Sequence, residues 1–220
     1  MTQSTARSLF LSALARSIPR PTPGASVIVG VDGVDGAGKT RLADDLAVVL
    51  CESDRVERVS IDGFHHQREH RYRRGRGSAE GFWRDSYDYD RFLHEVVAPF
   101  RAGTGTYLSA AHDVETDAVL TGPRHPVPRG VILLVDGIFL HRPELREVWD
   151  ATIFLDVPFD VSVPRMAVRD ESSPDPDAEE NARYVGGQRL YLRECRPAER
   201  ATILVDYADL EHPVIDRGGS

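Results

Sequence analysis

The chain has 220 residues, 41% of them hydrophobic, with a formal net charge of −8 and two cysteines. This length suits one α/β domain, and the acidic balance argues against general binding to nucleic acids or to anionic membranes. Two cysteines indicate reduced thiols in a cytoplasmic setting, and no apolar run is long enough to span a membrane. We therefore expect one cytoplasmic domain over residues 1–220.

The first predicted elements are a helix and a buried strand. Apolar residues recur on one face of residues 4–18, which predicts a helix, and three prolines before residue 24 end it. Residues 27–31 read VIVGV, which predicts a buried strand. A glycine-rich turn follows, and the next predicted helix runs to residue 51.

The turn after this strand matches G-x-x-x-x-G-K-[ST], in the strand–turn–helix context of a phosphate-binding loop. Small residues let several backbone N–H groups converge on a phosphate, Lys39 adds a positive charge, and the Thr40 hydroxyl can hold Mg²⁺. Of the 27 Lys and Arg residues, Lys39 is the only lysine, which indicates that an ammonium group is required there. The loop assigns ATP binding to Gly33, Val34, Asp35, Gly36, Ala37, Gly38, Lys39 and Thr40.

Two further predicted strands end at an aspartate. Residues 56–61 lead to Asp62, and residues 131–135 lead to Asp136. The carboxyl ends of parallel strands meet at one edge of a sheet, so both side chains should face the phosphate loop. Asp136 is placed to support Mg²⁺, and Asp62 could accept a proton from an attacking hydroxyl.

The rest of the chain continues the alternation of strands and helices. We expect helices over residues 89–100, 159–169 and 178–193, strands over 152–157 and 202–205, and a hairpin within 106–120. This order predicts an α/β P-loop NTPase fold, with helices on both faces of a parallel sheet. A segment at about 170–183, which contains two prolines, is the candidate lid, and Gly186-Gly187 indicates a kink or a close backbone approach.

Five motifs resemble those of the uridine kinases. Residues 60–64 (SIDGF) resemble their S-x-D-x-F segment, residues 135–139 (VDGIF) their V-E-G-I segment, and residues 165–170 their R-x-x-x-R-D helix end. Tyr87-Asp88 is similar to their aromatic–Asp pair, and Tyr107 with His112 repeats their Y-x-x-x-x-H spacing. The resemblance extends from residue 27 to residue 191.

The resemblance implies a nucleoside-kinase-like fold and ATP- and Mg²⁺-dependent phosphorylation of a hydroxyl, with a pyrimidine nucleoside as the first candidate acceptor. It implies that Asp62 is the base and that Thr40 and Asp136 serve Mg²⁺. The other roles that it implies concern the two substrates. Asp88 and Tyr87 would hold the sugar, Tyr107 and His112 the nucleobase, Arg165 and Arg169 the ATP phosphates, and His65 and Arg183 line the acceptor site.

Several departures from the family leave alternatives open. The lid segment at residues 173–177 is acidic where the uridine kinases carry arginines, and His65 and Arg183 replace an aromatic residue and a glutamine. Kinases of pantothenate, of a sugar or of a sugar phosphate therefore stay open, as does a thymidylate kinase, which the phosphate loop also resembles. A nucleotide-binding switch without an acceptor is the non-enzymatic alternative, and a homo-oligomer is not excluded.

The arginine-rich residues 68–77 are a further candidate site. Because the whole chain is acidic, we interpret them as a solvated loop near the acceptor entrance that could attract an anionic substrate, and not as a nucleic-acid site.

Overall fold

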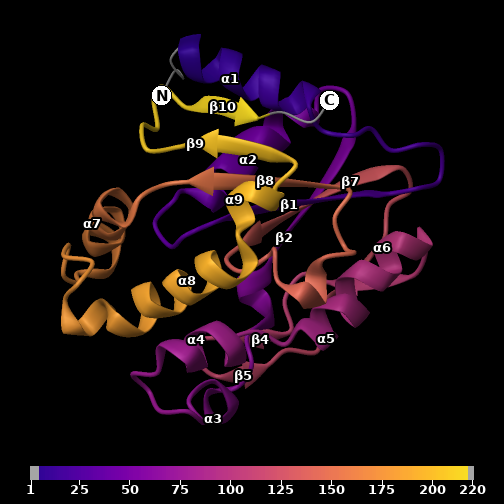
Figure 1. Ribbon diagram of the computed structural model, residues 1–220. Coiled ribbons are helices and arrows are strands. Elements are labelled where there is room, and N and C mark those ends of the chain that lie inside the picture. The colour runs from indigo at the N-terminus through magenta and orange to yellow at the C-terminus, as the bar shows by residue number, and fades with distance from the viewer. Residues whose placement is uncertain (1–4, 218–220) are drawn as a thin grey trace.

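The computed structural model describes residues 5–217 and contains a six-stranded sheet in the order β10-β9-β8-β1-β7-β2 (Figure 1). Strands β2, β7, β1, β8 and β9 are parallel, and β10 pairs with β9 in the antiparallel direction. The strands are β1 (Val27–Gly33), β2 (Arg55–Ser60), β7 (Val131–Gly137), β8 (Ala151–Asp156), β9 (Ile203–Asp206) and β10 (Val214–Arg217). The predicted parallel α/β sheet is therefore confirmed, and β10 is an edge strand that we did not predict.

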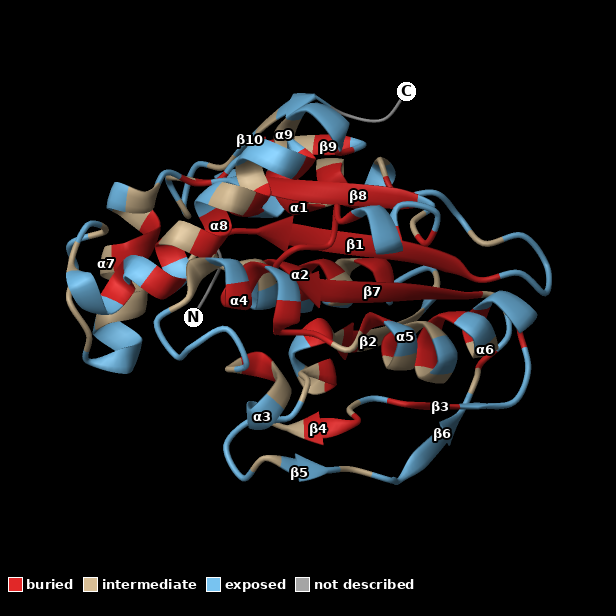
Figure 2. Ribbon diagram, turned by 60° about the horizontal axis from the view of Figure 1, so that its bottom comes forward, coloured by how far each residue is buried: buried red, intermediate tan, exposed pale blue. Residues whose placement is uncertain are grey.

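Alternate residues of the central strands point to opposite faces of the sheet. Val29 and Val31 pack in one core with helices α1 (Thr5–Arg16) and α2 (Lys39–Leu50), whereas Ile28 packs in the other. That second core includes α4 (Ala79–Asp85), α5 (Tyr89–Phe92) and α8 (Ala182–Cys195). Figure 2 shows β1 and β7 buried along their length and β8 buried up to its last residue, Asp156, which is exposed. The predicted helix start at Ser4 lies outside the described residues.

The remaining elements are short, apart from α7. The helical elements are η1 (Ile61–Phe64), α3 (Arg68–Arg71), η2 (Leu93–Val97), α6 (Ala98–Ala102), η3 (Pro143–Leu145), α7 (Phe159–Asp170), η4 (Glu179–Asn181) and α9 (Pro197–Arg200). The short strands are β3 (Thr106–Leu108), β4 (His112–Asp113), β5 (Ala118–Val119) and β6 (Arg124–Pro126). Over residues 5–217, no helix combines the length and the apolar character needed to cross a membrane.

Three predicted segments differ in detail. The predicted helix over 89–100 consists of α5, a π-helical stretch η2 and α6 in succession. Within 106–120, β4 and β5 form the expected hairpin, but β3 pairs with β6. Residues 68–71 of the predicted arginine-rich loop form the short helix α3, so a loop over all of 68–77 was wrong.

The glycine pair in α8 allows this helix to approach α4 closely, as the two elements show in Figure 1. A Cβ atom added at Gly187 would lie 2.8 Å from the carbonyl oxygen of Ala79 and 2.8 Å from Cδ1 of Phe82. A Cβ atom added at Gly186 would lie 2.9 Å from Cβ of Ala79. The sequence indicates either a kink or a close backbone approach at this pair, and the packing supports the close approach.

Candidate active site

The phosphate loop connects β1 to α2. Gly36 and Gly38 adopt φ angles of 74° and 92°, in the left-handed region that favours glycine. A Cβ atom at Gly36 would lie 2.1 Å from the carbonyl oxygen of Ser162 in α7, so this position has no room even for the side chain of alanine. The ammonium of Lys39 donates a hydrogen bond to the Val34 carbonyl at 2.9 Å. The loop therefore closes over itself, with Lys39 at the start of α2.

Asp35, in the middle of the loop, is held by α8. Its backbone N–H donates to Oε1 of Gln188 at 2.6 Å, and the Gln188 amide donates back to the Asp35 carboxylate at 3.2 Å. Burial raises the pKa of the Asp35 carboxyl, and the neighbouring charge of Lys39 opposes the increase. These contacts connect the loop directly to the helix that follows the lid segment.

Asp136 lies beneath the loop at the end of β7. Its carboxylate accepts a hydrogen bond from the Thr40 hydroxyl at 2.7 Å and one from Arg58 of β2 at 2.6 Å. Arg58 also pairs with Asp44 of α2. A hydroxyl next to a carboxylate is the hard oxygen donor set that suits Mg²⁺. Thr40 and Asp136 therefore fit the metal that the sequence predicts, although no group of three or more metal-ligating side chains occurs among residues 5–217.

Asp62 lies at the end of β2, in the short helix η1, and its side chain is exposed. Its carboxylate accepts a hydrogen bond from the Tyr87 hydroxyl at 2.8 Å. Burial, and then the charge of Asp62, raise the pKa of Tyr87 well above its ordinary value, so this hydroxyl stays a donor. Two backbone hydrogen bonds hold the two segments together. The N–H of Asp88 donates to the carbonyl of Phe64, and the N–H of His66 donates to the carbonyl of Ser86.

Asp62 and Asp35 line the same cavity, of about 340 Å³, which we call the acceptor cavity. It is bounded by Asp35, Asp62, His65, Arg71, Tyr72, Phe82, Ser86, Tyr87, Val114, Ile138, Arg169, Arg183 and Tyr184. The terminal carboxylate of β2 and the phosphate loop thus open onto one space, as the sequence predicts. Six of the predicted site residues besides Asp35 and Asp62 line this cavity or the one described next: His65, Tyr87, Asp88, His112, Arg169 and Arg183.

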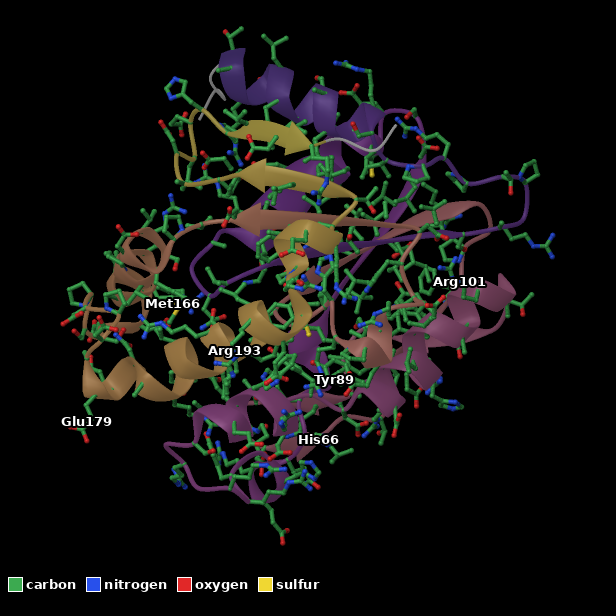
Figure 3. The ribbon with its side chains drawn as sticks, in the orientation of Figure 1. His66, Tyr89, Arg101, Met166, Glu179 and Arg193 are labelled. Carbon is green, nitrogen blue, oxygen red and sulfur yellow. The ribbon has the colours of Figure 1, made fainter. Side chains whose placement is uncertain are left out.

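A second cavity, of about 440 Å³, is adjacent to the acceptor cavity, and we call it the histidine cavity. His112 and Asp88 line it, and His65 lines both cavities. Nε2 of His112 is 3.0 Å from a carboxylate oxygen of Asp117, whereas its Nδ1 has no hydrogen-bond partner among the described residues. Figure 3 shows His66, another lining residue, in the lower part of the molecule. The full lining is Phe64, His65, His66, Gln67, Glu69, His70, Arg73, Asp88, Arg91, Ala111, His112 and Val119.

Three predicted site residues make other contacts. The Tyr107 hydroxyl donates to Glu57 at 2.9 Å, and Tyr107 lines neither of these two cavities. Arg165 donates to the backbone carbonyls of Tyr207 and Ala208. Arg183 reaches the acceptor cavity, but it donates to several backbone carbonyls of residues 71–78. The spacing Y-x-x-x-x-H therefore does not bring Tyr107 and His112 to one pocket.

The lid segment borders a third cavity, of about 450 Å³, which Asp35 also lines. Arg169 lines both this cavity and the acceptor cavity, and it is paired with Asp170. Met166 of α7, labelled in Figure 3, also lines it. Glu171 and Glu180 make the surroundings acidic, as the sequence of the lid segment indicates.

Sequence reasoning missed several residues that shape this site. Arg58 and Gln188 lie outside the sequence motifs, so no local pattern marks them. Arg71, in contrast, belongs to the arginine-rich residues 68–77 that the sequence marks as a candidate site. Asp32 carried a signal, since it is a charged residue in an otherwise apolar strand. It is completely buried, accepts a hydrogen bond from the Gly33 N–H, and lies 2.6 Å from Nδ1 of His141. Asp32 thus fixes the start of the loop.

Comparison with known sequences identifies kinases as relatives. A uridine kinase from Shewanella frigidimarina is 25% identical over 207 residues, covering 88% of this chain and 88% of its own length. A pantothenate kinase from Streptomyces avermitilis is 32% identical over 125 residues, covering 56% of this chain and 37% of its own length. No family model matches the chain.

Solved structures share the fold. A Bacillus stearothermophilus protein described as a "possible uridine kinase" superposes with a TM-score of 0.66 and 22% identity, covering 88% of this chain and 96% of its own. Phosphoribulokinase from Rhodobacter spheroides superposes with a TM-score of 0.54 and 12% identity, covering 84% of this chain and 71% of its own. The chain therefore has the fold of the P-loop kinases, and its resemblance to the group of uridine kinase, phosphoribulokinase and pantothenate kinase is confirmed.

Proposed function

We propose that this protein transfers the γ-phosphate of ATP to a hydroxyl group of a small molecule. The observation that carries the proposal is the shared cavity of Asp35 and Asp62, which places an exposed carboxylate next to the phosphate loop. In the proposed step, the acceptor hydroxyl gives its proton to Asp62, its oxygen bonds to the γ-phosphorus, and the bond to the β-phosphate oxygen breaks to release ADP.

The loop and its neighbours would supply the electrostatic part of the reaction. Lys39 would neutralise charge on the outer phosphates, and Arg169, at the boundary of two cavities, would approach the phosphates from the lid side. Thr40 and Asp136 would hold Mg²⁺, which neutralises charge that develops during transfer. Tyr87 would orient the Asp62 carboxylate through its 2.8 Å hydrogen bond.

A pyrimidine nucleoside is the acceptor that the motifs favour first. Asp88, His65 and His112 line the histidine cavity, where they could contact a sugar and a base. Tyr107 is outside that cavity, so we do not assign it to acceptor binding. A pantothenate acceptor is the second candidate, because a named pantothenate kinase is among the relatives. A switch without an acceptor has no use for Asp62 and Tyr87 at this position.

The proposal is tested by measuring ADP formation from MgATP with uridine, cytidine, thymidylate, pantothenate and a panel of sugars. We expect ADP formation to depend on one class of acceptor and to be lost in both Lys39→Ala and Lys39→Arg, because a guanidinium does not replace the compact ammonium. Arg76→Gln changes an exposed arginine outside these cavities and should keep wild-type activity. ADP formation that no acceptor stimulates would refute the kinase proposal.

A further inference from the structure

Three arginines line the acceptor cavity, and two of them are already engaged. Arg183 donates hydrogen bonds to the carbonyls of Arg76 and Ser78 at 3.0 and 3.1 Å. Arg169 forms a two-point contact with Asp170 at 2.6 and 2.8 Å. These guanidinium groups therefore have oxygen partners within the protein.

Arg71, on α3, is different. It is 8% exposed, and its Nε has no hydrogen-bond partner among residues 5–217. Its Nη2 lies 3.6 Å from a carboxylate oxygen of Asp117, beyond ordinary hydrogen-bond distance. That same oxygen already accepts the Arg68 N–H at 2.9 Å and contacts His112 at 3.0 Å.

A buried guanidinium with incomplete partners is unfavourable, because the charge loses its hydration without full compensation. A ligand that brings an oxyanion into the acceptor cavity would supply the missing acceptors. The planar fork of arginine matches a carboxylate or phosphate in two-point geometry. A neutral ligand would not bring an oxyanion to the Arg71 guanidinium.

We propose that the acceptor carries a phosphate or carboxylate group that Arg71 binds, while Asp62 receives the proton of its hydroxyl. This inference rests on the proposed kinase function and specifies its substrate class. Both side chains line one cavity of about 340 Å³, so the hydroxyl and the oxyanion belong to the same small molecule. The acceptor is then an anionic alcohol, so the contacts of Arg71 favour the pantothenate and sugar-phosphate alternatives over the neutral nucleoside that the motifs place first.

The test is a titration of the ADP- and Mg²⁺-saturated protein with two matched pairs of compounds. Ribulose 5-phosphate is compared with ribulose, and pantothenate with its neutral analogue panthenol, so that the pairs separate phosphate from carboxylate. We expect the anionic member of at least one pair to bind about 10- to 100-fold more tightly, as a charged hydrogen bond predicts. Arg71→Gln should abolish that preference, and Arg71→Lys should restore part of it.

Two further variants keep the test independent of folding. Val114 is 42% exposed and lines the same cavity, so Val114→Glu should weaken binding of the anion while Val114→Gln should not. Arg76→Gln, in the same segment but outside the cavity, is the matched arginine control. Equal affinity within both pairs, no binding by any of the four compounds, or a preference that survives Arg71→Gln overturns the inference. A failure of the wild type to bind ADP would instead count against the proposed function.

Discussion

The two aspartates at the strand ends have different surroundings and therefore suit different roles. Asp136 is 2% exposed, and both of its carboxylate oxygens accept strong donors, from Thr40 and Arg58. Asp62 is exposed and accepts the neutral hydroxyl of Tyr87. A carboxylate with free lone pairs can take up a proton from a substrate, whereas one paired with arginine does so poorly. This contrast supports the proposed roles of Asp62 as the base and of Asp136 as the support for Mg²⁺.

We predict that Asp62→Asn lowers kcat by about 10²- to 10⁴-fold, the range for loss of general-base catalysis. The substitution keeps the shape of the side chain but removes its ability to accept the proton. ATP binding should change little, because the proposal assigns the phosphates to the loop and not to Asp62. Steady-state kinetics and ATP titration measure the two effects separately.

The control for this prediction is Asp90→Asn, an equivalent change at an exposed residue of α5 that lines none of the three cavities. It should retain wild-type kcat. A normal kcat in Asp62→Asn, with ATP still bound, would show that Asp62 is not the base.

Among the individual site residues, the sequence predicts those that lie in local motifs. Lys39, Thr40, Asp62 and Asp136 follow apolar strands, and parallel topology brings strand ends together. Arg58 could not be identified in the same way, because its importance depends on its neighbour Asp136, which only the fold supplies. Arg71 was indicated only as one of the arginines of residues 68–77, and its contact with Asp117 depends on the fold. Tyr107 shows that a matching spacing does not determine where a side chain points, because its hydroxyl donates to Glu57 and it lines neither the acceptor cavity nor the histidine cavity.

Among the elements, the last residue of α4 holds the segment that connects α3 to α4. Asp85 is 1% exposed and accepts hydrogen bonds from Arg73 at 2.5 Å and from Arg74 at 2.9 Å. Burial alone would raise the pKa of Asp85, but the hydrogen bonds and charges of the two arginines outweigh it, and the pKa is lowered. The charged form is therefore the one that the folded protein stabilises.

We predict that Asp85→Asn lowers the free energy of unfolding by about 1–3 kcal/mol near neutral pH. A carboxyl whose pKa is lower in the folded state stabilises the protein above its unfolded pKa, and this contribution is lost as the pH falls through the folded value. The difference between wild type and variant should thus shrink below about pH 4. Urea unfolding at a series of pH values measures it, and a difference independent of pH would contradict the assignment.

The contact between α4 and α8 depends on a glycine instead of a charge. We predict that Gly187→Ala lowers the free energy of unfolding, since the added methyl group would meet the backbone carbonyl of Ala79 at 2.8 Å. Overpacking costs about 1–3 kcal/mol, which exceeds the gain of at most about 1 kcal/mol in helix propensity. Gly77→Ala is the matched control, because a Cβ atom there has no neighbour within 4 Å. Equal denaturant midpoints for the two variants would contradict this packing argument.

The sequence predicts a helix or a strand correctly where that element has a clear hydrophobic pattern. The continuous apolar runs of β1 and β7 marked buried parallel strands, and the apolar stripes marked the longer helices. Helix α4 was missed because its seven residues are too few to show a period, although Ser78 caps it. Strand β10 was missed because it is mostly exposed, so its sequence lacks the signal of burial.

Across the whole molecule, the first helix is joined to the last segments of the described chain. Arg7 of α1 is 3% exposed and pairs with Asp45 of α2 at 2.6 Å. Its guanidinium also donates to the Tyr207 hydroxyl at 2.9 Å and to the Leu210 carbonyl at 2.7 Å. The Tyr207 ring in turn lies 3.3 Å from the position of a Cβ atom at Gly38. Elements about 200 residues apart thus meet behind the phosphate loop.

We predict that Arg7→Ala lowers the free energy of unfolding by about 2–4 kcal/mol, because it leaves a partly buried carboxylate and a buried hydroxyl without their donor. Tyr207→Phe removes only the hydroxyl and should cost less, about 1 kcal/mol. Arg7 joins α1 and the segment that contains Tyr207 and Leu210 to α2. Each variant should therefore unfold in one transition, at a lower temperature than the wild type. Calorimetry and circular dichroism at matched pH measure both properties. A variant that loses α1 in a separate early transition would show that this helix is not part of the cooperative unit that contains the phosphate loop.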